Sequence, residues 1–218
     1  MLQKKELIEY CHKVSAKGFV AAADGNLSLR RADGTIVITS SGIPKGDTNL
    51  ENIVQCNLDG QVKFSKLKIS TESKLHFNIY NKRSDVNAVI HCHPPVATAY
   101  ASSGKSLDVP VFPEIVLNLG RIPLCTYATP STDALPESMN EYIEYANVFL
   151  LQNHGAVAVG RNIREAYFRM EKLEHYAKTM FYAEGLGGAK KLTREQIDEL
   201  YRLAPTVYNI SLDIRNKF

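Results

Sequence analysis

The sequence predicts a single-domain α/β protein, and three observations support this fold class. Short apolar runs of strand length, at residues 86–90, 147–152 and 156–159, alternate with longer segments whose apolar residues recur at helical spacing. The 218 residues are enough for one domain with a large core, and nothing in the sequence requires a second. No internal repeat or low-complexity linker divides the chain. We therefore expect one domain that covers residues 1–218.

The composition argues against several classes of protein. Hydrophobic residues at 44% and charged residues at 22% are ordinary for a globular protein, and the formal net charge of +3 is spread along the chain, so we expect no nucleic-acid partner. No apolar run approaches the roughly 20 residues that cross a bilayer, and the N-terminus leads into an amphipathic helix, so we expect no membrane contact and a cytoplasmic location. Four cysteines without paired spacing favour reduced thiols over disulfides: Cys11, Cys56, Cys92 and Cys125.

The N-terminal third is predicted to form a helix followed by hairpins. Residues 2–17 have apolar side chains at helical spacing. The dipeptide Gly25-Asn26 then breaks the chain before a strand of alternating apolar residues. Asp33-Gly34 is a turn signal, and it predicts a hairpin that continues into a strand at residues 35–39.

Two short polar segments each have a structural and a functional interpretation. Ser41 and Gly42 end a strand in a loop of small residues, which is commonly a plain turn but can also present N–H and hydroxyl donors to an oxyanion. Ser70 or Thr71 is expected to cap a helix with Glu72 in its first turn. Glu72 is then either a stabilising acid at the positive end of the helix dipole or a general base beside a phosphate-binding helix start.

The apolar run at residues 86–90 leads directly into His91-Cys92-His93-Pro94-Pro95. Side chains two apart on a strand point to the same face, so His91 and His93 should project together while Cys92 turns to the opposite face. The two prolines lack the N–H that a central strand needs, so the histidines should lie at a strand terminus. This spacing indicates a metal site, although two packed or solvated histidines would also fit it.

A third metal ligand is available at His154. It follows a second short apolar strand and precedes a glycine, so it too should leave a strand end. His12, His76 and His175 lie in segments with helical periodicity, and we interpret them as surface or packing residues. Three neutral imidazoles with an open fourth position match a catalytic zinc better than a structural one, which four protein ligands usually close.

The C-terminal half is predicted to contain a loop, a strand pair and further helices. Residues 110–122 form loop and short structure around one acid, Glu114, and a helix is expected around residues 136–145. Residues 163–184 predict a long helix. The sequence Thr193-Arg194-Glu195-Gln196 has the pattern of a capping box, which predicts the start of a last helix.

Taken in order, these motifs resemble the class II aldolase/adducin family, and most closely its bacterial L-fuculose-1-phosphate aldolases. The motifs are Gly25-Asn26 with Ser28, Thr39-Ser40-Ser41-Gly42, Ser70-Thr71-Glu72, His91-Cys92-His93 and Gln152-Asn153-His154-Gly155. One such motif alone is weak evidence, whereas five in the family's order over essentially the whole chain are specific to the family, though not to a substrate. The resemblance implies a three-layer α/β/α domain around a central mixed, largely antiparallel sheet.

The resemblance also implies roles for particular residues. His91, His93 and His154 would hold one Zn²⁺ per subunit, and Glu72 would be the catalytic acid/base that also touches the metal when no substrate is bound. The family's phosphate pocket maps onto Gly25, Asn26, Ser41, Gly42, Ser70 and Thr71. A catalytic tyrosine near the C-terminus corresponds to Tyr208, which would act in a neighbouring subunit's site because the family forms homotetramers with active sites between subunits.

The implied activity is zinc-dependent cleavage of a ketose 1-phosphate, with L-fuculose 1-phosphate as the first candidate, to dihydroxyacetone phosphate and an aldehyde such as L-lactaldehyde. Glu114 stands where those enzymes carry a second active-site tyrosine, so it either sets aldehyde specificity or faces solvent or a subunit contact. Pentulose-5-phosphate 4-epimerases and methylthioribulose-1-phosphate dehydratases or aldolases are alternatives within the family. A non-enzymatic adducin-type interaction module would be expected to lack the metal histidines, and all three are present.

Overall fold

A computed structural model of the chain describes residues 2–63 and 67–218. These residues form an eight-stranded sheet in the order β4-β3-β2-β1-β5-β8-β7-β6. The strands are β1 (Asn26–Arg30), β2 (Ile36–Thr39), β3 (Ile53–Cys56), β4 (Val62–Lys63), β5 (Ala88–Cys92), β6 (Leu124–Cys125), β7 (Val148–Leu151) and β8 (Gly155–Gly160). Neighbouring strands are antiparallel except β6 and β7, which run parallel. The mixed, largely antiparallel sheet confirms the prediction.

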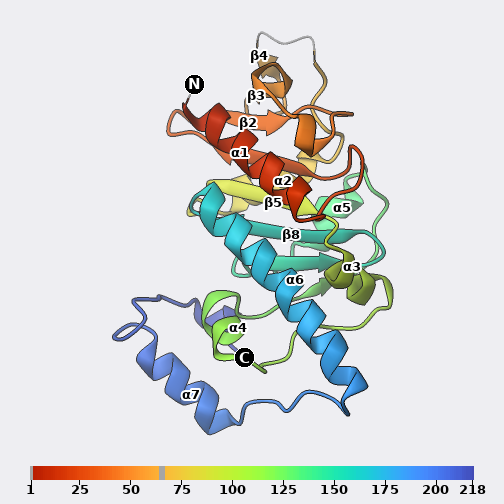
Figure 1. Ribbon diagram of the computed structural model, residues 1–218. Coiled ribbons are helices and arrows are strands. Elements are labelled where there is room, and N and C mark those ends of the chain that lie inside the picture. Colours follow the sequence, from red (N-terminus) through yellow and green to blue (C-terminus); the bar gives the residue numbers. More distant parts are fainter. Residues whose placement is uncertain (1, 64–66) are drawn as a thin grey trace.

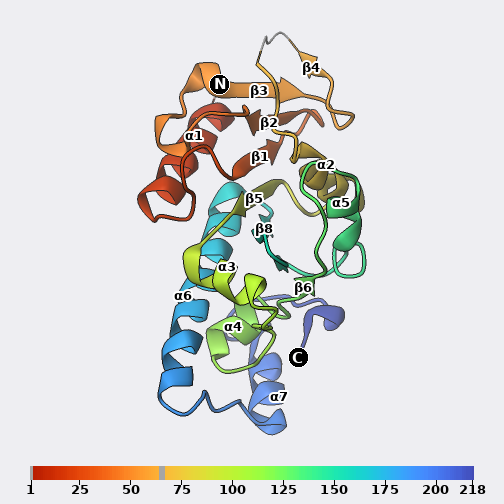
Figure 2. The same cartoon turned by 90° about the vertical axis from the view of Figure 1, so that its right-hand side faces the viewer.

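Helices cover both faces of this sheet (Figure 1). They are α1 (Leu2–Ala16), α2 (Ser73–Lys82), α3 (Pro95–Ser102), α4 (Pro113–Asn118), α5 (Ala134–Ser138), α6 (Ile163–Gly185) and α7 (Arg194–Leu203), with 3-10 turns η1 (Lys45–Asp47), η2 (Leu50–Asn52) and η3 (Ile214–Asn216). Figure 2 shows α1, α3 and α6 on one side of the strands and α2 and α5 on the other. The molecule therefore has the three layers that the family resemblance implied.

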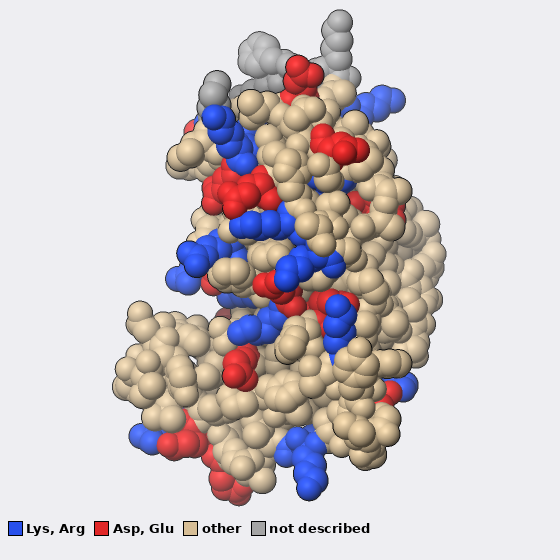
Figure 3. Space-filling model, viewed as in Figure 1, with Lys and Arg blue, Asp and Glu red and all other residues tan. Residues whose placement is uncertain are grey.

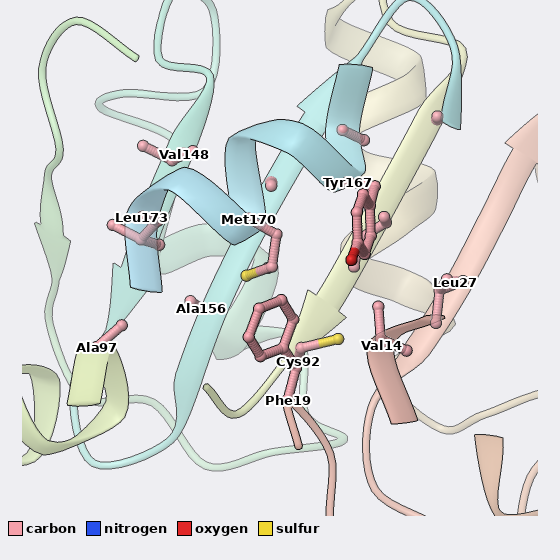
Figure 4. Packing of buried hydrophobic residues seen from close by; sticks show 14 of the residues in the cluster. Val14, Phe19, Leu27, Cys92, Ala97, Val148, Ala156, Tyr167, Met170 and Leu173 are labelled. Carbon is pink, nitrogen blue, oxygen red and sulfur yellow. The ribbon is translucent and has the colours of Figure 1, made fainter. Parts of the chain in front are cut away.

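Alternation along the strands gives each face its own hydrophobic core. On β5, Ala88, Ile90 and Cys92 are fully buried in the cluster that includes residues of α1, α3 and α6. Val89, on the other face, belongs to the cluster with α2 and α5. Figure 4 shows Cys92 among the side chains of the first cluster, next to the ring of Phe19, and the cluster contains neither His91 nor His93. The central strand is thus buried on both sides, and the prediction that Cys92 turns away from the histidines is confirmed.

Most predicted elements are present with bounds shifted by one or two residues. Thr193 caps α7 in the predicted capping box. Its side chain accepts from the backbone N–H of Gln196, and the Gln196 side chain accepts from the backbone N–H of Thr193. Gly34, at φ +79°, turns the β1–β2 hairpin as expected. The helix expected at residues 136–145 is wrong in its bounds, because α5 ends at Ser138 and the chain continues in successive turns held by i to i+3 and i to i+4 backbone bonds.

Charged side chains of both signs are interspersed on the face drawn in Figure 3. Lys17 after α1 pairs with Glu171 of α6 at 2.7 Å, so neighbouring elements match charges instead of accumulating one sign. Among the described helices, none has the length and apolar character needed to cross a membrane.

Candidate metal centre

Three histidines converge at the end of β5. His91 is in β5, His93 follows it, and His154 lies in the turn between β7 and β8. One ring nitrogen from each side chain lies within 4.8 Å of the nitrogens from the other two, and the ring centroids are 4.7 to 5.2 Å apart. One cation can therefore contact all three rings.

Proline and glycine residues set the backbone that brings these rings together. β5 ends at Cys92, and α3 starts at Pro95, where the missing N–H costs nothing because the first helical N–H groups have no partner within a helix. The N–H of His93 is instead fixed by the Phe19 carbonyl at 2.8 Å. A Cβ atom at Gly155 would stand 2.5 Å from His93 Cδ2, so only glycine lets β8 approach this ring.

The protonation state of His91 suits a metal ligand. Its Nδ1 lies 3.0 Å from the Ala156 carbonyl oxygen, which can only accept, so Nδ1 carries the proton and the Nε2 lone pair faces the cluster. Burial lowers the pKa of His91 to about 3, which keeps the ring neutral at physiological pH. Its Nε2 lies 3.3 Å from Nε2 of His93. This donor set fits a divalent cation with three nitrogen ligands and a position left for another ligand.

Glu72 faces the same point from α2. It occupies the N-cap position instead of the first turn, its side chain makes no cap hydrogen bond, and the helix begins at Ser73. Its Oε1 lies 3.0 Å from His154 Nε2 and its Oε2 lies 3.4 Å from His91 Nε2. Burial acts to raise the pKa of Glu72, but the hydrogen bond to His154, the neighbouring imidazoles and the Asn26 amide outweigh it and lower the pKa to about 2. The carboxylate is therefore ionised, and it can either add an oxygen ligand or accept a proton.

Gly25 and Asn26 lie directly beside this centre. Gly25 has φ +72°, and a Cβ atom there would be 2.8 Å from the His91 carbonyl oxygen, so this position requires glycine. The Asn26 amide donates to Glu72 Oε2 at 2.9 Å and to Ser70 Oγ at 3.2 Å. The start of β1 is thus tied to both the candidate base and the loop that precedes α2.

The remaining residues of the predicted phosphate pocket come from two loops that touch. Ser41 and Gly42 are exposed, and the N–H of Ser41 donates to the Lys68 carbonyl at 3.0 Å. Ser40 forms an isolated β-bridge with Ile69, which places the loop after β2 next to Ser70. Thr71 is exposed, and its hydroxyl accepts from Ser131 Oγ at 2.6 Å. The structure therefore brings together the segments that the sequence analysis grouped.

Two buried residues near the centre were not recognised in the sequence. Lys45 is 1% exposed, and its ammonium donates to the carbonyls of Ala23 at 3.1 Å and Ile43 at 2.8 Å, so it joins the segment before Gly25 to the segment after Gly42. His76, interpreted as a surface or packing residue, is fully buried and hydrogen-bonded to Asn26 Oδ1. The one sequence signal for this contact was the position of His76 one helical turn after Glu72.

Tyr208 and Glu114 lie outside the cluster. Within the described residues, no hydrogen bond, ion pair or ring contact joins either side chain to the three histidines. Tyr208 is half-exposed in the segment after α7, which lies on the left of Figure 1, whereas α3, which follows His93, lies on the right. Glu114 is exposed in the first turn of α4, where its charge raises the pKa of Lys172 against the larger, lowering effect of that lysine's burial.

Comparison with known proteins places these features in context. Residues 5–181 match the family described as the Class II Aldolase and Adducin N-terminal domain. The chain is 31% identical to a 5-deoxy-D-ribulose 1-phosphate aldolase of Bacillus thuringiensis serovar kurstaki, over 91% of this chain and 93% of the relative. It is 32% identical to a 3-oxo-tetronate 4-phosphate decarboxylase of Pectobacterium atrosepticum, over 90% and 91%. A solved L-fuculose 1-phosphate aldolase superposes with a TM-score of 0.83 at 28% identity, covering 92% of this chain and 94% of that structure.

Proposed function

This chain belongs to the class II aldolase and adducin family, and from that premise we propose that it is a zinc-dependent aldolase that cleaves a ketose 1-phosphate. One observation carries the proposal. The ionised carboxylate of Glu72 faces the cluster of three imidazoles, which combines a proton acceptor with a cation site.

The proposed substrate is L-fuculose 1-phosphate or a related deoxyketose 1-phosphate. Relatives of this chain are named for L-fuculose 1-phosphate and for 5-deoxy-D-ribulose 1-phosphate. Both compounds carry a methyl group at the end distant from the phosphate. Cleavage next to the three-carbon phosphate half gives dihydroxyacetone phosphate from each, with L-lactaldehyde from the first and acetaldehyde from the second.

The three imidazoles would hold the zinc ion, which when bound supplies electrostatic stabilisation of the negative charge that develops on the substrate's carbonyl oxygen. The protein's own groups move the protons. In the condensation direction the ionised Glu72 takes a proton from the carbon next to that carbonyl, and cleavage reverses this step. Because the pKa of Glu72 is lowered to about 2, the carboxylate is in its accepting form at neutral pH.

We assign the substrate's phosphate to the loops beside Glu72. Ser70, Thr71, Ser41 and Gly42 offer hydroxyl and backbone N–H groups, and Asn26 offers its amide. Tyr208 would donate a proton to the aldehyde oxygen during condensation. Since Tyr208 is remote from the histidines of its own chain, this role requires a homotetramer in which the tail of one subunit reaches the site of another. We also place the enzyme in the cytoplasm, where sugar phosphates occur.

Decarboxylation of a 3-oxo-tetronate 4-phosphate is the second candidate, because a relative with this name is as similar in sequence as the aldolases are. That reaction also develops negative charge beside a carbonyl group, so the same cation site and phosphate loops would serve it. The 4-epimerase and dehydratase reactions of the family remain further outcomes of the same assay.

A substrate panel tests the proposal. Zinc-loaded protein is incubated with L-fuculose 1-phosphate, 5-deoxyribulose 1-phosphate, a pentulose 5-phosphate, methylthioribulose 1-phosphate and 3-oxo-tetronate 4-phosphate. Dihydroxyacetone phosphate and carbon dioxide are measured, with chelator-treated protein as the control. We expect dihydroxyacetone phosphate from a deoxyketose 1-phosphate, and none after chelation. Carbon dioxide release, or an epimerised or dehydrated product as the only metal-dependent reaction, would replace the aldolase assignment.

A further inference from the structure

A chain of buried hydrogen bonds runs from Glu72 into the core. Asn26 donates to Glu72 Oε2 at 2.9 Å, and its Oδ1 contacts Nε2 of His76. On the other side of the ring, Nδ1 of His76 lies 2.6 Å from Ser28 Oγ, which lies 2.7 Å from the hydroxyl of Tyr80. The last four side chains are at most 2% exposed, so they have little access to water as an alternative partner.

The charge of Glu72 fixes the direction of every bond in this chain. An ionised carboxylate only accepts, so Asn26 must turn its NH₂ group to Glu72 and its carbonyl oxygen to His76. His76 must then donate from Nε2. Burial lowers the pKa of His76 to about 3, so the ring is neutral and Nδ1 is an acceptor. Ser28 therefore donates to Nδ1 and accepts from Tyr80.

The same series of hydrogen bonds holds the Asn26 amide in one orientation. If the amide turned by 180°, its oxygen would face the Glu72 carboxylate and its NH₂ group would face the Nε2–H of His76. That arrangement sets two acceptors together at one end and two donors together at the other, and both pairs are buried. Unpaired buried groups are costly, so a neutral His76 with its proton on Nε2 strongly disfavours the turned amide.

The held amide acts on two groups of the site at once. It contacts Glu72 and, at 3.2 Å, the hydroxyl of Ser70, so it sets the distance between the candidate base and a hydroxyl of the proposed phosphate loop. Glu72 has no side-chain cap bond of its own at the start of α2. Its remaining contacts are with the imidazoles, and a bound cation would compete for them.

We propose that His76 is a positioning residue: it donates from Nε2 to Asn26 and thereby holds the amide that orients the Glu72 carboxylate and the Ser70 hydroxyl. This inference rests on the proposed role of Glu72 as the proton acceptor. His76 itself does not touch the substrate. Its effect passes through Asn26, and Ser28 and Tyr80 keep its proton on the correct nitrogen.

Two substitutions separate this role from simple packing. His76→Gln retains an N–H donor near the position of Nε2, whereas His76→Leu removes it while keeping an apolar side chain. On the best substrate of the panel, we expect kcat of zinc-loaded His76→Leu to fall by about 10- to 100-fold and His76→Gln to recover most of that loss. His12→Leu is the matched control, since His12 lies exposed on α1 and its Nε2 lies 2.9 Å from the Thr48 carbonyl oxygen. A core residue without a positioning role would lower thermal stability in both His76 variants and leave kcat per zinc-loaded site unchanged.

A double-mutant comparison gives the sharper result. If His76 acts through Glu72, then His76→Leu should lower kcat much less in a Glu72→Gln background than in the wild type. Full additivity of the two losses would overturn the inference.

A measurement without substrate keeps the inference separate from the proposed function. Side-chain ¹⁵N spectra of histidine-labelled, zinc-loaded protein identify the protonated nitrogen, and the His76→Gln spectrum assigns the His76 signals. We expect a neutral ring protonated at Nε2. A proton on Nδ1 would overturn the positioning role whichever sugar phosphate is turned over. Correct protonation together with no aldolase activity would instead reject only the proposed function.

Discussion

The central strands β1 and β5 present apolar side chains to one face of the sheet and, at one end, polar side chains to the other. On β1, Leu27 and Leu29 enter the apolar cluster beneath α1 and α6, while Asn26 and Ser28 point to the face of α2. On β5, Cys92 lies in the apolar cluster, and the histidine before it lies in the metal centre on the other face. The register pairs Asn26 with His91, so polar residues of both strands meet on one face at one end of the sheet.

This difference shows how a fully buried sheet can support a reactive site. The face of α1, α3 and α6 supplies stability through apolar packing, and its buried charges are tied to backbone groups. Glu174, for example, accepts from the N–H groups of Val96 and Ala97 at the start of α3. The face of α2 is apolar only in part, and the polar end is completed by side chains that bond one another. Since the strand period is two, a shift by one residue would exchange the two sets.

The largest effect is expected from removing a ligand on the polar face. His154→Ala leaves two imidazoles, so zinc content measured by inductively coupled plasma mass spectrometry should fall to below about a tenth of the wild-type value. The control is His175→Ala, an exposed histidine on α6 across the sheet, which should keep its zinc. Full zinc occupancy and activity in His154→Ala would remove His154 from the site.

Glu72→Gln should separate chemistry from metal binding on that same face. The amide keeps the shape of the side chain but is not basic, so kcat should fall by about 10² or more while zinc is largely retained. Steady-state kinetics at fixed zinc loading provide the measurement. Glu171→Gln on the opposite face, which removes one surface ion pair with Lys17, serves as the control. Wild-type turnover in Glu72→Gln would end its assignment as the base.

A truncation on the apolar face should give the converse result. Met170 is fully buried against the sheet, so Met170→Ala should lower the free energy of unfolding by about 2–5 kcal/mol without changing zinc content per folded chain. Urea unfolding followed by circular dichroism measures the first quantity, and metal analysis of the folded protein measures the second. Zinc loss as large as that of His154→Ala would show that the two faces are not separable.

The smallest effect is expected at Glu114, which lies in neither face of the central strands. A tyrosine there would offer an aromatic surface to an apolar aldehyde, whereas a carboxylate disfavours such contact. If a neighbouring subunit brings Glu114 to the site, Glu114→Tyr should shift the ratio of kcat/KM values towards deoxy sugars several-fold, the effect of about 1 kcal/mol. An unchanged ratio between L-fuculose and ribulose 1-phosphates would exclude a specificity role.

Local patterns predicted much of this molecule because their causes are local. Strand alternation placed His91 and His93 together, paired prolines ended β5, and the capping box set the start of α7. The buried partners of Glu72 could not be predicted in this way, because they depend on how α2 packs against β1. Ser28 and His76 are 48 residues apart, and nothing near either residue specifies the contact.

The helix expected at residues 136–145 is a second case in which the local pattern did not determine the structure. Its residues can form helical backbone bonds, and two such i to i+4 bonds occur after Met139. Leu135, Met139 and Ile143 follow the spacing of one helix face and all lie in the core on the α2 side of the sheet, although the backbone between them forms separate turns. The apolar spacing thus indicated the buried face correctly, but it did not indicate where the regular helix ends.

The pairing of β5 with β8 also constrains the order in which the protein matures. His91 and the Ala156 carbonyl that orients it are 65 residues apart, so the donor set exists only after the centre of the sheet has closed a long loop. A nascent chain that ends before β7 holds two of the three imidazoles and lacks the Ala156 carbonyl that orients His91. We therefore expect the metal to bind after the sheet has assembled, and a cell short of that metal to accumulate folded but metal-free chains instead of unfolded ones.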